Sequence, residues 1–163
     1  MNYELDWLPP MVLMEAYEND WDRYLEALYK HFKNDFVDSR PKFNGQNIQL
    51  KRYPIERGKE ATFWHLISQG QNEETRLPDF RRCERIRWPR PLIERFRHES
   101  VRCWTNRRRG EIRFLIALAD FSYVTILSLR KGYLLLWTAY FLESEHQRIK
   151  LSKDYLRSLT LTD

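Results

Sequence analysis

Residues 101–141 read VRCWTNRRRGEIRFLIALADFSYVTILSLRKGYLLLWTAYF, and this stretch decides the fold class. Apolar and polar residues alternate in it with the period of two that half-buried β-strands show. Short polar connectors divide the stretch into four segments, and connectors of this length join neighbouring antiparallel strands. The predicted strands are Val101–Thr105, Glu111–Leu118, Ser122–Leu129 and Tyr133–Phe141. We therefore expect a four-stranded antiparallel sheet between residues 100 and 142.

The N-terminal residues have a helical period instead. Apolar residues recur at spacings of three and four in Met11–Phe36, which predicts a helix with one apolar face. Asp20 is suited to begin a second helix after a break. The helical region should end before Pro41, because the residue before a proline avoids the helical conformation. Asn47–Tyr53 alternates polar and apolar residues and predicts a short strand.

Shorter elements lie between the N-terminal helices and the sheet. Ala61–Ser68 is an apolar run that fits a helix or a strand equally well. Asp79 is suited to cap a helix that extends to about Ile86, and Leu92–Phe96 predicts a further helical turn. Glu143–Leu156 predicts a closing helix. The order of helices followed by neighbouring strands is typical of an α+β fold.

The length of 163 residues fits a single domain, 1–163. We divide this domain into an acidic helical region (1–40), a basic region (41–110), the sheet (100–142) and a C-terminal helix and tail (143–163). Cys83 and Cys103 are too few for a disulfide framework. No signal peptide is apparent, and the apolar stretch Tyr133–Leu142 is about half as long as a membrane helix. We expect a cytoplasmic protein without a membrane partner.

Charge is distributed unevenly along the chain. The net charge is −5 over residues 1–40, +9 over residues 41–110 and +1 over residues 111–163. Most basic residues of the middle region are arginines, and arginine is favoured where phosphates are bound bidentately or bases are stacked. A segregated positive charge attracts polyanions, and RNA is the expected partner. The alternative is that arginine is a common surface residue without a ligand.

The basic charge is densest between residues 76 and 90. Arginine beside aromatic residues is the composition that binds phosphates while bases stack. The alternative is a set of structural ion pairs, for example Arg76 or Arg82 with Asp79. A second cluster, residues 107–109, lies at a predicted hairpin tip beside Trp104. The candidates for phosphate or base contacts in the first cluster are Arg76, Arg81, Arg82, Arg85 and Trp88.

His65 is the candidate for acid–base chemistry, because histidine titrates near neutral pH. Its neighbours are apolar, so the alternative is a hydrogen-bonded core histidine. Thr138 and Tyr140 lie two residues apart on a predicted strand and point to the same face. Tyr123 and Tyr140 could present hydroxyls on one sheet face, and the alternative is that they serve packing. The four histidines and two cysteines show no metal-ligand spacing, and five glycines include no cofactor loop, so we expect neither metal nor cofactor.

Four tracts together resemble the nucleases of the barnase/EndoU/colicin/RelE-like (BECR) superfamily over roughly residues 45–142. The tracts are Phe63-Trp64-His65, the arginine-rich stretch from Arg76 to Trp88, Asp120-x-x-Tyr123-Val124 and Leu136-x-Thr138-Ala139-Tyr140. The resemblance implies N-terminal helices followed by a four-stranded antiparallel sheet. It also implies metal-independent ribonuclease activity, with His65 as general acid or base.

The resemblance further nominates residues that bind or cleave the substrate. The catalytic candidates are His65, Arg76, Arg82 and Tyr140, and the substrate-binding candidates are Arg81, Arg85, Trp88, Tyr123 and Thr138. The expected function is a toxin-type RNA endonuclease in which the 2′-OH attacks the adjacent phosphate, with an antitoxin or inhibitor protein as a possible partner. One alternative is a nucleic-acid-binding module without chemistry. Another is a protein-interaction subunit whose basic face binds an acidic partner.

Overall fold

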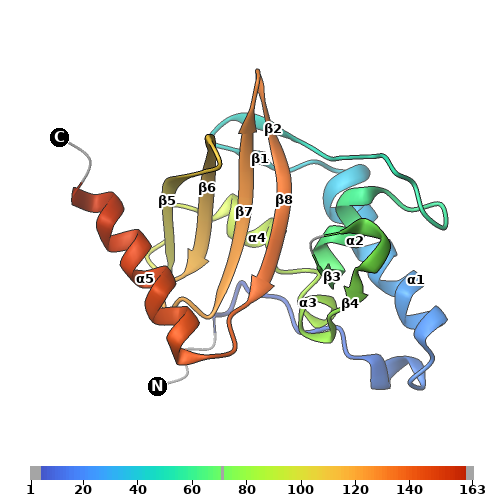
Figure 1. The fold of residues 1–163 in the computed structure, drawn as a ribbon. Helices are drawn as coiled ribbons and strands as arrows, with labels where there is room; N and C mark the ends of the chain where they lie inside the picture. The colour runs from blue at the N-terminus through green and yellow to red at the C-terminus, as the bar shows by residue number, and fades with distance from the viewer. Residues whose placement is uncertain (1–4, 71, 161–163) are drawn as a thin grey trace.

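The computed structural model describes residues 5–70 and 72–160, which form an α+β fold around one main sheet (Figure 1). Helices α1, α2 and α3 lie to one side of this sheet, α4 lies behind it, and α5 runs beside β5. The predicted α+β class is confirmed. None of the described helices is both long enough and apolar enough to cross a membrane.

The C-terminal part of the sheet is the predicted antiparallel meander. Its strands are β5 (Val101–Arg108), β6 (Glu111–Leu118), β7 (Tyr123–Arg130) and β8 (Tyr133–Phe141). Each pairs antiparallel with the next in sequence. The β5–β6 turn consists of Arg109 and Gly110, both with positive φ, as a two-residue turn between twisted strands requires.

The prediction of a four-stranded antiparallel sheet was wrong, because the main sheet is mixed and has six strands in the order β1-β2-β8-β7-β6-β5. β1 (Lys42–Phe43) and β2 (Gln46–Gln49) form a hairpin around Asn44 and Gly45, which both have positive φ. β2 then pairs parallel with β8, where Ile48 lies opposite Leu134. Burial of Ile48, which is 1% exposed, favours this added pairing.

A register irregularity in the β7–β8 pair determines which side chains of β8 share a face. Leu136 pairs with Leu127 and Thr138 pairs with Ile126, so Trp137 is the extra residue of a bulge. Thr138 and Tyr140 consequently point to one face, as predicted. Tyr123 pairs with Phe141, one residue beyond Tyr140, so the two tyrosines lie on opposite faces and the expectation of a shared face was wrong.

The N-terminal region contains a 3-10 turn (Met14–Tyr17), helix α1 (Trp21–Phe32) and a π-helical turn (Lys33–Val37). The carboxylate of Asp20 accepts hydrogen bonds from the backbone of Asp22 and Arg23, which confirms Asp20 as the helix cap. Aromatic side chains attach α1 to the rest of the domain. The ring of Phe63 lies 5.2 Å from that of Tyr29 and 5.5 Å from that of Phe32.

Residues 61–94 form a compact group of short elements beside the sheet. The ambiguous run at residue 61 is a helix, α2, and Asp79 caps α3 by accepting from the backbone of Arg81 and Arg82. The elements of this part and the closing helix are α2 (Ala61–Ile67), β3 (Ser68–Gln69), a 3-10 turn (Glu73–Thr75), β4 (Leu77–Pro78), α3 (Phe80–Glu84), α4 (Pro89–Glu94) and α5 (Glu145–Thr160).

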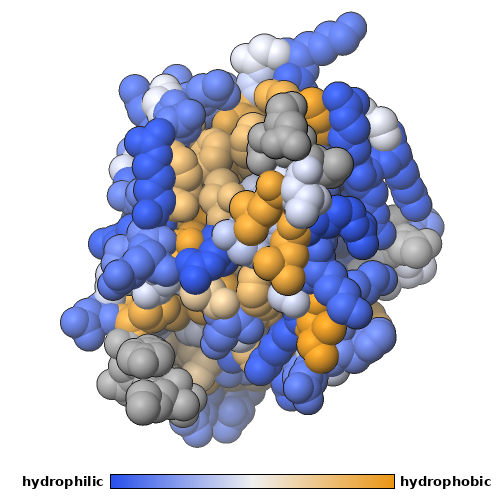
Figure 2. Space-filling view, turned by 90° about the vertical axis from the view of Figure 1, so that its left-hand side faces the viewer, coloured by the Kyte–Doolittle hydropathy of each residue, from blue (hydrophilic) through white to orange (hydrophobic). Residues whose placement is uncertain are grey.

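The two faces of the sheet are covered differently. One face packs against α1, α2 and α4 in the main hydrophobic core. On the other face, α5 covers mainly the β5 side, where Trp104 packs on Tyr155 and donates to the carboxylate of Asp154. The side that carries α5 mixes hydrophobic and hydrophilic side chains (Figure 2), and α5 exposes Ile149 and Leu156 there. α2 and α3 contact the sheet at β8.

Candidate active site at the edge of β8

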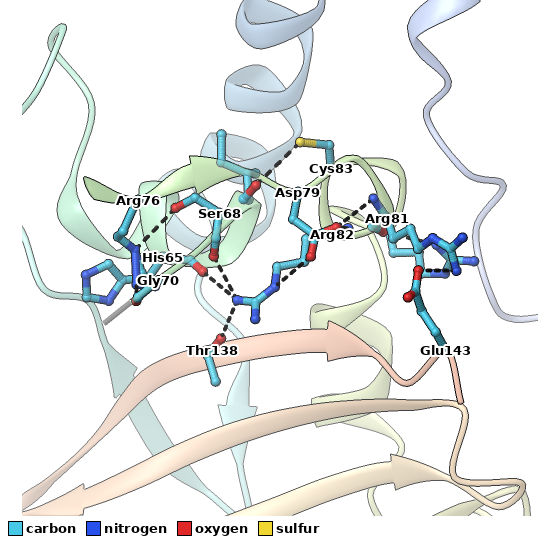
Figure 3. A network of polar contacts seen from close by, with 12 residues as sticks. His65, Ser68, Gly70, Arg76, Asp79, Arg81, Arg82, Cys83, Thr138 and Glu143 are labelled. Carbon is cyan, nitrogen blue, oxygen red and sulfur yellow. Dashed lines mark hydrogen bonds and ion pairs between the residues drawn. The ribbon is translucent and has the colours of Figure 1, made fainter. Parts of the chain in front are cut away.

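The candidate site lies along the second half of β8. β2 pairs with β8 only at Leu134 and Leu135, so from Leu136 onward β8 has no neighbouring strand on that side within the described residues. An open strand edge exposes unpaired backbone groups and is usually covered. Here α2 and α3 lie against it and bring polar side chains to Thr138 (Figure 3).

Arg82 is the centre of this contact (Figure 3). Its Nη1 donates to the backbone oxygens of Ser68 at 2.8 Å and His65 at 3.3 Å, and to Oγ1 of Thr138 at 3.2 Å. The guanidinium carbon also lies 5.4 Å from the ring centre of Tyr140. One side chain of α3 therefore links the end of α2 to the edge of β8.

The charge of Arg82 is largely satisfied within the protein. Burial lowers the pKa of its guanidinium, and Asp79 opposes that change with its carboxylate 3.5 Å from Nε. The structural ion pair between Arg82 and Asp79, considered as an alternative from the sequence, is therefore present. Arg82 therefore connects parts of the protein to one another, and its charge is not free for a ligand.

His65 occupies the last turn of α2 and is 8% exposed. Its ring meets the ring of Trp137 edge-on, with 5.6 Å between the centres and 85° between the planes. The same histidine lines a cavity of about 130 Å³ beside α2. His65 therefore lies between this cavity and the bulged residue of β8.

The cavity beside His65 has mainly apolar walls, among which several polar side chains stand. Arg76 lines it and donates from Nε to Oγ of Ser68 at 3.3 Å and from Nη1 to the backbone oxygen of Gly70 at 2.8 Å. Ser68 also lines the cavity and donates to the backbone oxygen of Trp64. Two exposed carboxylates, Glu56 and Glu74, belong to the lining as well. A histidine, an arginine, a hydroxyl and carboxylates are thus gathered around one small space.

Thr138 and Tyr140 have half-buried side chains on one face of β8, where Tyr140 packs against the smaller hydrophobic cluster that α5 also contacts. Arg113 of β6 shares this face, because it pairs with Ser128, which lies two residues beyond Ile126. Burial, followed by the nearby charge of Arg108, lowers the pKa of Arg113. Its Nε is buried and has no hydrogen-bond partner among the described residues. A second cation therefore stands on the same sheet face as Tyr140.

The remaining predicted substrate-binding residues lie apart from this cluster. Arg81 pairs with Glu143, and the guanidinium of Arg85 lies 4.1 Å from the ring centre of Phe141. The indole of Trp88 donates to the backbone oxygen of Pro9 at 2.9 Å.

Tyr123 is 2% exposed, and its ring meets that of Trp88 edge-on with 5.2 Å between the centres. Burial strongly raises the pKa of Tyr123. This placement offers a substrate no access to Tyr123.

Four of the nine predicted residues lie outside the site, and five residues at the site were not predicted from the sequence. Ser68, Glu56 and Glu74 carry no signal in a local pattern, since only the fold brings them beside His65. Trp137 and Arg113 were passed over as ordinary strand residues, although alternation alone placed Arg113 on a defined face. The structure does bring His65, Arg76, Arg82, Thr138 and Tyr140 into one region.

This arrangement can supply the groups that phosphoryl transfer needs. An imidazole and carboxylates can exchange protons, and guanidinium and hydroxyl groups can bind phosphate oxygens. Among the described residues, no three or more His, Cys, Asp or Glu side chains are grouped so that they could hold a metal ion. No family model matches the chain, and no curated protein or solved structure is significantly similar to it.

Proposed function

We propose that this protein is a metal-independent RNA endonuclease of toxin type. The proposal joins the resemblance to BECR nucleases with the placement of His65 among phosphate-binding groups. The observation that carries it is the position of the His65 ring, between the cavity that Arg76 lines and Trp137 at the edge of β8. Cleavage of cytoplasmic RNA, restrained by an antitoxin or inhibitor protein, is the biological role that this activity implies.

The reaction is an internal transesterification. The 2′-oxygen forms a bond to phosphorus, the bond from phosphorus to the 5′-oxygen breaks, and the products are a 2′,3′-cyclic phosphate and a 5′-OH. One group must take the 2′-OH proton and another must give a proton to the leaving 5′-oxygen. His65 is the residue assigned to one of these transfers, and Glu74 or Glu56 is available for the other.

The negative charge that develops on the phosphate needs cations and hydrogen-bond donors. Arg76 supplies a guanidinium at the cavity, and the hydroxyls of Thr138 and Tyr140 lie on the adjoining face of β8. Arg82 acts as a positioning residue, because its Nη1 donors already hold the backbone of His65 and Ser68. This division differs from the direct phosphate contact that the sequence predicted for Arg82.

The test is RNA cleavage in the presence of EDTA by the wild type, His65→Ala and a matched control, His146→Ala. His146 is an exposed histidine of α5. Loss of general acid–base catalysis reduces rates by about 10²–10⁴-fold, so we expect that loss for His65→Ala and a wild-type rate for His146→Ala. Absence of cleavage by the wild type, or equal rates for all three proteins, would remove the proposal.

A second candidate is an RNA-binding module without chemistry. The net charge of +9 over residues 41–110 favours this alternative, because it supports RNA binding without requiring a catalytic group. It predicts binding that weakens steeply with salt, since counterions are released from the RNA, and no cleavage product. Anisotropy of a labelled RNA at several salt concentrations, read beside the cleavage assay, separates the two candidates.

A further inference from the structure

A second and larger hollow lies beside the candidate active site, where β2 and β8 part. β2 runs parallel to β8 only as far as Gln49, opposite Leu135. The backbone of Lys51 instead bonds to Thr62 of α2: its N–H donates to Oγ1 at 2.7 Å, and its carbonyl accepts from the Thr62 backbone at 3.0 Å. This divergence leaves a groove of about 780 Å³. Ligand sites typically measure about 300–1,000 Å³, so the groove is large enough for a substrate.

The lining of the groove combines aromatic rings with basic side chains. Tyr133 and Trp137 supply the rings, and Lys51 and Arg130 supply positive charge. Tyr133 is 42% exposed, so its ring is accessible. None of the lining residues that the structure describes is acidic, although Glu111 outside the lining bonds Nη1 of Arg130 at 2.9 Å. The groove therefore suits an anion that carries flat apolar groups.

The guanidinium of Arg130 lies over the ring of Trp137. The guanidinium carbon lies 5.6 Å from the ring centre of Trp137, and Nε of Arg130 is buried with no hydrogen-bond partner among the described residues. Arginine held against an aromatic ring is an arrangement that also stacks nucleic-acid bases.

One residue, Trp137, connects the groove with the candidate active site. Trp137 lines the groove and its ring also touches that of His65. Trp137 is four positions after Tyr133, which is about 13 Å along a strand and exceeds the length of one nucleotide. The β7–β8 hairpin, which projects beyond the rest of the sheet, forms the far end of this path (Figure 1).

We infer that this groove binds the single-stranded part of an RNA substrate, with bases stacked on Tyr133 and Trp137 and phosphates against Arg130 and Lys51. The inference rests on the proposed function for its choice of RNA. A duplex does not fit this chemistry, because its base faces are already stacked on one another. The substrate class is therefore unpaired RNA, which enters the active site from the hairpin side.

The test uses fluorescence anisotropy of a labelled 2′-O-methyl RNA strand, which has no free 2′-OH to attack the phosphate. Loss of one stacked base weakens binding by about 5- to 160-fold, so we expect a loss in that range for Tyr133→Ala. Tyr133→Phe keeps the ring and should bind like the wild type. Leu129→Ala is the matched control, because Leu129 lies in the same hairpin but outside the groove lining. Circular dichroism melting confirms that each variant is folded.

Two further measurements sharpen the result. The same strand annealed to its complement should bind at least about tenfold more weakly. Arg130→Gln should reduce the slope of log affinity against log salt by about 0.7, the value for one phosphate contact on a single strand. Equal affinity for single strand and duplex, or an unchanged affinity in Tyr133→Ala, overturns the inference.

The outcomes for the groove and for the nuclease are distinguishable. Cleavage by the wild type together with unchanged binding in Tyr133→Ala overturns the groove and keeps the nuclease. Weakened binding in Tyr133→Ala without cleavage of any RNA keeps the groove and overturns the nuclease.

Discussion

Replacement of Arg82 tests how the site is held together. The side chain is 15% exposed, and Nη1 faces three acceptors: the backbone oxygens of His65 and Ser68 and the hydroxyl of Thr138. Nη1 carries two hydrogens, so the three contacts amount to about two full hydrogen bonds. Hydrogen bonds to a charged group contribute about 1.5–3 kcal/mol each, which gives about 3–6 kcal/mol for the pair.

We expect Arg82→Ala to lower the free energy of unfolding by about 3–5 kcal/mol, which is the lower part of the range estimated for the two hydrogen bonds. Asp79 keeps its hydrogen bonds from the backbone of Arg81 and of residue 82, so its carboxylate is not left without partners. Domains of this size have stabilities of about 5–15 kcal/mol, so the variant can still fold. Urea unfolding, followed by tryptophan fluorescence, measures the change.

Two variants accompany this measurement. Thr138→Val removes one of the shared acceptors and should cost about 0.5–1.5 kcal/mol. Arg40→Ala removes an exposed arginine whose Nη1 lies 3.5 Å from the side-chain oxygen of Gln49, and its effect should stay within about 0.5 kcal/mol. A loss below about 1 kcal/mol in Arg82→Ala, or a larger loss in Thr138→Val, would refute the linking role of Arg82.

Three other measurements probe the fold around the site. Burial, followed by the charges of Arg87 and a neighbouring lysine, lowers the pKa of His31 below its ordinary 6.5. Between the folded pKa and 6.5 the unfolded chain therefore binds more protons than the folded chain. The free energy of unfolding should rise with pH in that interval, and His31→Gln should flatten the rise. Burial raises the pKa of Cys83 to about 12 and that of Cys103 to about 11, so iodoacetamide should label both at pH 8 at least about 100-fold more slowly in the native protein than in urea. Asp20→Ala should cost about 1 kcal/mol in urea unfolding, because it removes the cap of α1, and an unchanged midpoint would contradict that assignment.

The sequence predicts best where local pattern and local structure coincide. The four strands from residue 101 follow their period of two, and their ends agree with the structure within a few residues. A new helix was predicted to start near Asp20, and Asp79 was predicted as a helix cap, because both signals depend on residues close in sequence. The helices at residues 21 and 80 consequently begin where expected.

The sheet edge could not be predicted in the same way. β2 pairs with β8 across 86 residues of chain, and this parallel contact has no local signature. The Asn44-Gly45 pair is a strong hairpin signal that the sequence interpretation passed over. The bulge at Trp137 is likewise invisible in an alternating pattern, yet it determines the faces of Thr138 and Leu136.

The residues of the candidate site were predicted from their type. Contacts between residues distant in sequence bring them together in the fold. His65, Arg82 and Thr138 were nominated separately, and their contact depends on α2 and α3 packing against β8. The sequence offered the ion pair of Arg82 with Asp79 only as an alternative, and the structure shows this pair. The sequence could not show that Tyr123 is buried, because burial follows from packing in three dimensions. Arginine density alone therefore overstates how many cations face a ligand.

The chemical ends of RNA fragments test the central claim most directly. Mass spectrometry of RNA incubated with the purified protein in EDTA should show fragments that end in 2′,3′-cyclic phosphate and begin with 5′-OH. The same fragments should be absent when His65→Ala, folded to the same extent, replaces the wild type. Intact RNA, fragments with 5′-phosphate ends, or identical fragments from His65→Ala would contradict an active site built around His65.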